Sequence, residues 1–130
     1  METVLKILPI VAVLLAVLFF KEGVAFYRYW KYCKLHEASK TGKIEDVRKL
    51  LREGHRVDAL DSSFGLTPLH FAVRNGRVEV ARLLIENGAS LSQPSTHGVT
   101  PLDWASEYLD PDQRDALLRS AAGGKGSGDV

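Results

Sequence analysis

The sequence predicts an all-α protein: a solenoid of about three helix-turn-helix repeats, preceded by a single transmembrane helix. Two features of the chain lead to this fold class. An almost unbroken apolar run extends from Val4 to Phe20, and a pattern with a period of about 33 residues begins after it. Periods of this length are typical of solenoids, in which each repeat buries its apolar side against its neighbours.

The apolar run contains one charged residue, Lys6. As a helix, it would cover roughly 25 Å, slightly less than the ~30 Å hydrocarbon core of a bilayer. The span can be longer, because Lys6 can reach outward to the headgroups and because Gly23–Phe26 is mostly apolar. The aromatic and basic side chains of Phe26–Tyr32 are typical of the headgroup region. We therefore expect residues 1–34 to form a transmembrane helix with a juxtamembrane collar, in contact with the membrane through residues 4–26.

A cleaved signal peptide is the alternative interpretation of this segment. Ile7–Phe20 has the length of a signal-peptide apolar region, and Gly23–Ala25 offers small residues for cleavage. The weakly basic start of the chain and the charged pair Lys21–Glu22, which precedes the cleavage site, argue against it. On this alternative the mature protein is exported, as a periplasmic or secreted soluble protein. A third interpretation is a buried helix of a larger assembly.

The charges that flank the apolar run predict its orientation. At the start of the run, the positive charges of the terminal amine and Lys6 are partly offset by Glu2. After the run come four basic residues: Lys21, Arg28, Lys31 and Lys34. Cytoplasmic flanks of membrane spans carry an excess of Lys and Arg. We therefore expect a single-pass protein whose C-terminal part lies on the cytoplasmic side.

The composition narrows the possible functions. The formal net charge is +1, so the basic excess of a nucleic-acid-binding domain is absent. Cys33 is the only cysteine, which excludes an intramolecular disulfide; it is either a small residue near the membrane or a palmitoylation site. The sequence has no Gly-rich phosphate loop and no His-Glu-x-x-His spacing. We expect no catalytic residue, cofactor, metal, nucleic acid or small-molecule substrate.

The repeats are visible as matching segments of sequence. HEASKTGKIEDVRKLLREG starts at His36, and HFAVRNGRVEVARLLIENG starts at His70. The segment GLTPL at Gly65 recurs as GVTPL at Gly98. With its Thr-Pro-Leu-His motif, the pattern resembles the ankyrin repeat family from Leu35 to Ala121. We assign three repeats, followed by a disordered Gly-rich tail: 35–61, 62–94, 95–122 and 123–130.

Local chemistry agrees with this resemblance. Thr67 can cap a helix that starts at Pro68, and Gly76 and Gly88 can adopt the left-handed conformation that ends each helix. The residues from Ala89 to Thr96 should form a projecting turn or hairpin loop. The resemblance implies that the histidine of the Thr-Pro-Leu-His motif, His70, joins a hydrogen-bond network with the threonine and nearby backbone; His36 is at the equivalent position.

The end repeats depart from the pattern, as capping repeats should. The first repeat lacks Thr-Pro-Leu, so its initial helix can continue directly from Trp30–Tyr32. The third repeat has Asp103 in place of His70, and Leu109 in place of the turn glycine. Asp110–Asp112, which includes a proline, then restarts a final helix that we expect to end around Ala121.

The resemblance also implies a protein-binding face. Ankyrin-repeat proteins usually meet their partners through the loop tips and the first helix of each repeat. The variable contact positions of the family fall on these residues of the present chain: Ser63, Phe64, Leu66, Phe71, Arg74, Asn75, Thr96, His97, Val99, Trp104, Glu107 and Tyr108. Four are aromatic, the side-chain type that often anchors an interface. Alternatively, Phe71 and Trp104 pack against the adjacent repeats. We expect a membrane-anchored module for protein–protein interaction, or an accessory subunit of a membrane complex.

Overall fold

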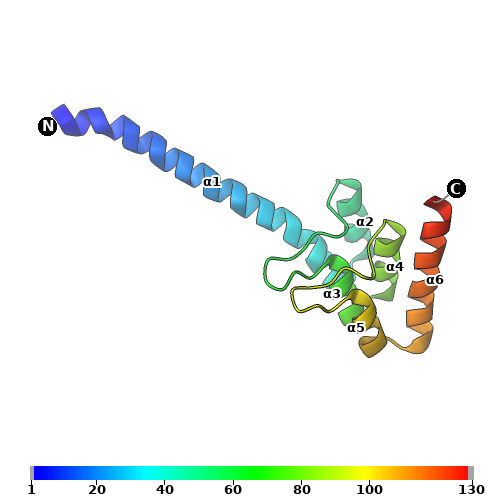
Figure 1. Ribbon diagram of the computed structural model, residues 1–130. Coiled ribbons are helices and arrows are strands. Elements are labelled where there is room, and N and C mark those ends of the chain that lie inside the picture. The colour runs from blue at the N-terminus through cyan, green and yellow to red at the C-terminus, as the bar shows by residue number, and fades with distance from the viewer. Residues whose placement is uncertain (1, 129–130) are drawn as a thin grey trace. The chain divides into compact units, whose positions relative to one another are not determined.

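The computed structural model describes the backbone of residues 2–128 and the side chains of residues 3–24 and 34–123. The chain divides into two compact units, Met1–Lys31 and Tyr32–Val130. Within the described backbone there are six α-helices and no strands. The first helix, α1 (Glu2–Thr41), contributes to both units (Figure 1). The side chains of the aromatic-basic collar and of Cys33 lie outside the described residues.

The first unit is the N-terminal part of α1. Its stretch Thr3–Val24 has a mean hydropathy of 2.7, and none of this stretch is buried. It is the one helix in the described part of the chain that is long and apolar enough to cross a membrane. A signal sequence has the same length and composition, so this helix fits both interpretations of the segment.

The middle repeat consists of α3 (Pro68–Arg74) and α4 (Val78–Glu86). The Thr67 hydroxyl accepts a hydrogen bond from the His70 backbone N–H, and the His70 ring accepts one from the Thr67 backbone N–H. Pro68 occupies the first turn, where a backbone N–H would have no partner within the helix, so the missing N–H of proline costs no hydrogen bond. Gly76 has a φ of 67°, which lets the chain turn sharply from α3 into α4. The predicted start and turn of this repeat are confirmed.

The first repeat pairs the C-terminal end of α1 with α2 (Ile44–Arg52), and the third pairs α5 (Pro101–Tyr108) with α6 (Pro111–Gly128). Thr100 caps α5, and Asp103 completes the capping box. Hydrogen bonds from the Thr100 backbone N–H and hydroxyl hold the pKa of Asp103 below its usual value. Leu109 is in an extended conformation, so the chain ends α5 without a left-handed residue.

The repeats stack by packing equivalent helices against one another. α2 packs against α4, and α4 against α6, while α3 packs against both α4 and α5 (Figure 1). Residues from all three repeats form one core, in which these are almost completely buried: Leu35, Val47, Leu69, Ala72, Val80, Leu84 and Leu117. The fold is therefore the predicted all-α ankyrin-type solenoid.

The final helix differs from its predicted extent. α6 is assigned to Gly128, past the expected end around Ala121 and into the segment expected to be a disordered tail. Its first part is fixed by Leu117, which is 1% exposed in the core. Residues 129 and 130 lie outside the described part of the chain.

Candidate protein-binding face

The first helices of the three repeats present equivalent positions, which we call the inner face. The sequence offsets between the repeats align these positions in three sets. The sets are Glu37, Phe71 and Trp104; Lys40, Arg74 and Glu107; Thr41, Asn75 and Tyr108. Phe71 and Trp104 are partly buried, and the other seven are exposed. The inner face therefore has half-buried aromatic rings along one set and polar or charged side chains along the others.

Two buried histidines fasten the loops to these helices. His70 is completely buried, its Nδ1 accepts the Thr67 backbone N–H at 3.0 Å, and its Nε2 donates to the Val99 carbonyl at 2.9 Å. Burial lowers the pKa of His70, which favours the neutral ring that this bonding pattern requires. His36 Nε2 lies 2.8 Å from the Ala59 carbonyl and 3.1 Å from the Leu66 carbonyl. The network that the resemblance implies, with the threonine and the backbone, is confirmed for His70, and His36 binds two backbone carbonyls of the loop that follows its repeat.

The same histidines support the aromatic rings of the inner face. Phe71 meets His36 edge-on, with centroids 5.5 Å apart and planes at 88°. Trp104 meets His70 in the same way, at 5.3 Å and 88°. Phe71 and Trp104 are equivalent residues, so this contact repeats along the stack. Both rings thus pack against the preceding repeat, as the alternative expects, while each keeps part of its surface exposed.

Two other aromatic side chains are free to meet a partner. Phe64 is 53% exposed at the tip of the loop before α3, and Tyr108 is 46% exposed at the end of α5. Phe64 lies 5.7 Å from the ring of His97, and Tyr108 lies 6.1 Å from Trp104 at 90°. Each exposed ring is thereby supported by a second ring, which limits its motion.

Backbone hydrogen bonds order the loop tips. Thr96 donates from its backbone N–H and its hydroxyl to the Phe64 carbonyl, at 2.9 and 2.8 Å, so the two loops lie side by side. The Asp61 carboxylate accepts from the backbone N–H groups of residues 63, 64 and 66. In the next loop, the Ser95 hydroxyl accepts from residues 97 and 99. The contact positions predicted from the sequence include neither Asp61 nor Ser95. The signal that identifies them is a side-chain acceptor shortly before each Thr-Pro.

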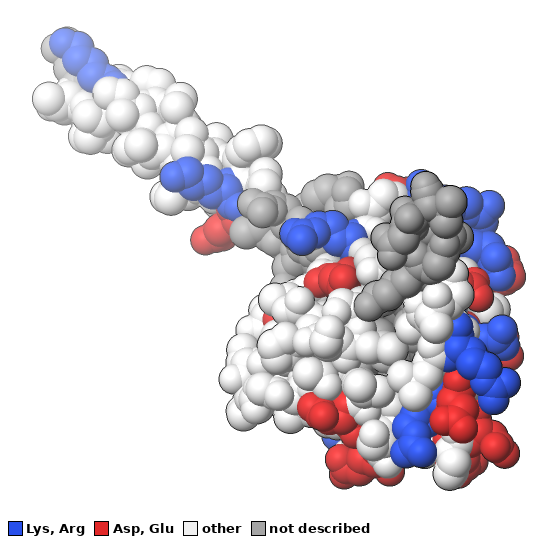
Figure 2. Space-filling view, turned by 45° about the vertical axis from the view of Figure 1, so that its right-hand side comes forward, with Lys and Arg blue, Asp and Glu red and all other residues white. Residues whose placement is uncertain are grey.

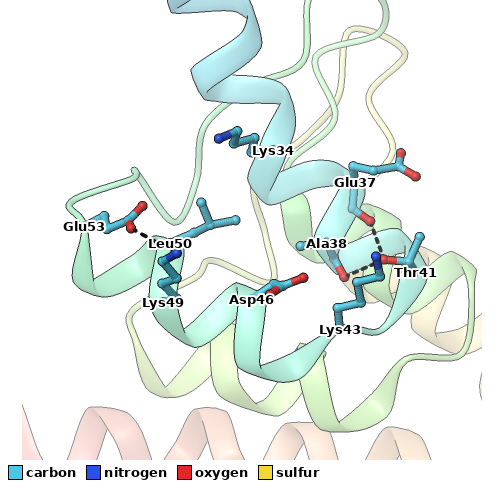
Figure 3. A pocket seen from close by; sticks show the side chains of 9 residues that line it. All are labelled: Lys34, Glu37, Ala38, Thr41, Lys43, Asp46, Lys49, Leu50 and Glu53. Carbon is cyan, nitrogen blue, oxygen red and sulfur yellow. Dashed lines mark hydrogen bonds and ion pairs between the residues drawn. The ribbon is translucent and has the colours of Figure 1, made fainter.

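A hollow of about 380 Å³ lies at the free end of the stack, between the end of α1 and α2 (Figure 3). Ala38 and Leu50 are its buried apolar lining, and the remaining residues around it are mostly charged: Lys34, Glu37, Thr41, Lys43, Asp46, Lys49 and Glu53. Lys49 and Glu53 approach to 3.9 Å. In the part of the chain that the structure describes, no group of three or more His, Cys, Asp or Glu side chains could hold a metal ion.

The pattern of helices, loops and histidines has a counterpart among known families. The family described as ankyrin repeats, in three copies, matches residues 35–123 of this chain. The chain belongs to the ankyrin-repeat family. The match covers the predicted repeats and includes the whole inner face. Ankyrin repeats indicate a module for protein–protein interaction, which is the general function that the fold supports.

Several curated relatives are similar to part of this chain. The SMC5-SMC6 complex localization factor protein 1 of Homo sapiens is 40% identical over 72 residues, which is 54% of this chain and 7% of the relative. The ARF GTPase-activating protein GIT1 of Homo sapiens is 35% identical over 74 residues, 57% of this chain and 10% of the relative. Diacylglycerol kinase iota of Rattus norvegicus is 41% identical over 80 residues, 60% and 8% respectively. The chain thus spans a tenth or less of the length of these relatives.

The ankyrin fold brings most of the predicted contact residues to two surfaces. The inner face holds Phe71, Arg74, Asn75, Trp104, Glu107 and Tyr108, and the loop tips hold Ser63, Phe64, Thr96 and His97. Leu66 belongs to neither, because it is 6% exposed and packs in the core. Val99 is half-buried, and its carbonyl is bound to His70. The exposed Glu37 and Lys40 of the first repeat share this face but are not among the predicted contact residues, and the repeat offset from Phe71 and Arg74 identifies their positions.

Proposed function

We propose that this chain is a membrane-anchored ankyrin-repeat module that binds a protein partner and serves as an accessory subunit of a membrane protein complex. One observation carries the proposal. Thr3–Val24 has a mean hydropathy of 2.7 with no residue buried, and the same chain continues into a folded ankyrin domain. The described part of the first unit consists of this helix alone, so no other element covers its apolar side chains. A bilayer would cover them.

The short connection between the two parts supports a partner at the membrane. Val24 ends the apolar stretch, and Leu35 is the first buried residue of the ankyrin domain. Even fully extended, the chain between them covers at most about 40 Å. A domain tethered so closely meets proteins in or on the membrane at high effective concentration. The basic residues Lys21, Arg28, Lys31 and Lys34 favour the cytoplasmic side for this domain.

The inner face supports binding rather than catalysis. Phe64 and Tyr108 are large, exposed and held by neighbouring rings, which suits the anchors of an interface. Both ring nitrogens of His70, by contrast, are already used by Thr67 and Val99. A histidine bonded in this way is not available as a general base. A standard interface needs about 800 Å² from each partner, and we propose that the inner face and loop tips supply it.

The anchor is tested on the protein isolated from its own cell membranes. We expect it to stay in the pellet after extraction at alkaline pH and to have the intact mass of the full chain. Protease applied to the cytoplasmic side should degrade the ankyrin domain. A mature chain that begins at Phe26 would contradict the anchor and would support the exported alternative, in which the repeats bind a periplasmic or secreted protein.

The binding face is tested by removing its two exposed aromatic anchors. We expect Phe64→Ala together with Tyr108→Ala to abolish co-purification of the wild-type partner from solubilised membranes, with little change in the melting temperature. Leu118→Ala is the matched control, because Leu118 is 40% exposed on α6, away from this face. Unchanged co-purification by the double variant would show that the partner binds elsewhere.

A further inference from the structure

Arg74 has an unusual setting in the middle of the inner face. It lies on α3, at the position that Lys40 occupies in the first repeat and Glu107 in the third. Its side chain is exposed, and its guanidinium carbon lies 5.6 Å from the centroid of the Trp104 ring. Among the described residues, ion pairs join Glu45 to Arg48 and Lys49 to Glu53, and none includes Arg74.

The ring under Arg74 is itself restrained. Trp104 meets His70 at 88° with centroids 5.3 Å apart, and Tyr108 at 90° with centroids 6.1 Å apart. A guanidinium placed over an aromatic ring keeps N–H groups at its edge for other partners. Because the stacked side chain has already lost rotamer freedom, it loses less on binding. The edge of a guanidinium matches the two oxygens of a carboxylate.

The inner face and the loop tips also carry exposed aromatic and hydroxyl side chains. Tyr108 on α5 is exposed and contacts the Trp104 ring, and Phe64 is exposed on the loop tip, where serine and threonine add hydroxyl groups. On the face of the ankyrin domain that Figure 2 shows, Lys, Arg, Asp and Glu side chains gather along one side, while a broad area beside them carries few charges. Arg74 shares the inner face with Lys40, Glu37 and Glu107, and among the described residues it is the cation that lies over an aromatic ring there. This setting suits a partner segment in which apolar residues flank one acidic residue.

We propose that the Arg74–Trp104 pair binds an acidic side chain of the protein partner, and that the neighbouring exposed aromatics contact apolar residues of the same segment. This inference rests on the proposed function of the inner face. It adds the chemistry of the partner: a carboxylate flanked by large apolar side chains. Lys40, the equivalent cation of the first repeat, extends the positive potential of Arg74 toward the start of the stack.

A lipid headgroup is the other source of an oxyanion for Arg74. An anionic membrane surface would face Glu37 and Glu107 together with Arg74, since all three belong to the inner face. Like charges brought together in this way oppose binding. A peptide can instead present one carboxylate to Arg74 and neutral groups to the glutamates, which is why the charges of the inner face favour a protein segment.

The test uses the full chain in nanodiscs of phosphatidylcholine, with Trp30→Phe so that Trp104 is the remaining tryptophan. Two capped peptides are titrated, Gly-Leu-Phe-Asp-Leu-Phe-Gly and its twin with Asn in place of Asp, while the indole N–H resonance of Trp104 is followed. We expect saturable shifts with both peptides and at least tenfold tighter binding of the Asp peptide. Arg74→Gln should remove this difference. Arg82→Gln, on the exposed side of α4, should retain it.

Four results would overturn the proposal: equal binding of the two peptides, equal effects of the two arginine variants, no saturable shift at millimolar peptide, or a Trp104 shift caused by phosphatidylserine nanodiscs alone. The last result would identify a lipid as the ligand. These results leave the proposed function separately testable, because the double variant of Phe64 and Tyr108 reports on the whole face. If the double variant loses partner capture while Arg74→Gln captures the partner as the wild type does, the inner face is the binding site but Arg74 does not bind a carboxylate of the partner.

Discussion

Helices α2 and α4 are equivalent in sequence, yet they meet different surroundings. Val80, Leu83 and Leu84 of α4 are 1%, 9% and 0% exposed. At the equivalent positions, α2 has Asp46, Lys49 and Leu50, and all three line the hollow at the free end of the stack (Figure 3). α4 has helices on both sides, α2 and α6, whereas α2 packs only against α4 among the second helices.

This difference shows how the chain limits its own stack. A repeat with two neighbours uses apolar residues on both sides of its second helix. The first repeat keeps apolar residues toward α4 and places charged residues on the side without a neighbour, which prevents further helices from packing there. Lys49 of α2 and Glu53, the residue that follows this helix, form an exposed ion pair, which keeps that surface polar and contributes little stability. The hollow is therefore the capped end of the solenoid.

Exchanging the residue types at equivalent positions of α4 and α2 should have the largest effect on the free energy of unfolding. Val80→Asp would bury a carboxylate without a partner, and we expect it to lower the free energy of unfolding by at least about 4 kcal/mol. The equivalent exchange at the free end, Asp46→Val, should change it by less than about 0.5 kcal/mol, because this side chain is exposed. Urea denaturation followed by circular dichroism measures both. Tolerance of Val80→Asp would show that the core is looser than its burial indicates.

Truncating the equivalent leucines should give a smaller but graded difference. Leu84 is completely buried between helices, so Leu84→Ala should leave a cavity and lower the free energy of unfolding by about 3 kcal/mol. Leu50 is 8% exposed and borders the hollow, which solvent already reaches. We expect Leu50→Ala to lower it by roughly half as much. Equal losses would mean that the hollow is closed in solution, for example by a bound partner.

The sequence predicts the parts of this structure that depend on local chemistry. Thr67 with Pro68, and Thr100 with Pro101, identify helix starts because a capping hydroxyl and a proline act within one turn. Gly76 identifies a turn because its positive φ favours glycine. Contacts between repeats cannot be predicted from these local signals. The stacking of Arg74 on Trp104, and the bond from Thr96 to Phe64, depend on how two loops or helices approach in space.

Leu66 shows the same limit for the candidate binding face. Its place in the motif suggests a contact residue, but the structure buries it beside His36, which binds the Leu66 carbonyl. Phe64, which lies just before it in the same loop, is exposed. Alternation along a loop is not periodic as it is along a helix or strand, so the sequence pattern does not separate inward from outward side chains there.

The middle and third repeats differ at one capping position, and pH should separate them. His70 and Asp103 are equivalent residues that each complete a capping box. Desolvation lowers the pKa of His70 from 6.5, against smaller opposing effects of the Val99 carbonyl and of Asp61 and Asp58. The unfolded chain therefore binds a proton near pH 6.5, and the folded chain binds it only at lower pH. His70 then contributes stability that is complete above pH 6.5 and falls as the pH decreases through this value.

We expect the wild-type domain to lose stability as the pH falls below about 6.5, by at most about 1.4 kcal/mol per pH unit for this group. His70→Asn, whose amide oxygen can still accept the Thr67 N–H, should flatten the profile in this range, and His97→Asn, at an exposed histidine, should not. Asp103 is an acidic group, so it stabilises the fold in its ionised form, whereas His70 does so in its neutral form. Because its pKa is lowered in the fold, ionised Asp103 stabilises the folded chain at pH values above its usual pKa of 3.8, and this contribution is lost only in stronger acid. An unchanged slope in His70→Asn would assign the acid sensitivity to another group.

The smallest expected effect compares two glycines that end equivalent helices. Gly42 and Gly76 have φ values of 80° and 67°, so alanine at either position adopts an unfavourable backbone conformation, which costs about 1 kcal/mol. A Cβ at Gly76 would meet open space, whereas one at Gly42 would lie 2.8 Å from Cδ of Arg77, whose Nε donates to the Lys40 carbonyl. Gly42→Ala must displace this arginine as well, and it should therefore lower the melting temperature more than Gly76→Ala does. Arg77→Ala removes the obstruction, so in that background the two alanine variants should become equal; a persistent difference would place the strain in the backbone of the first repeat itself.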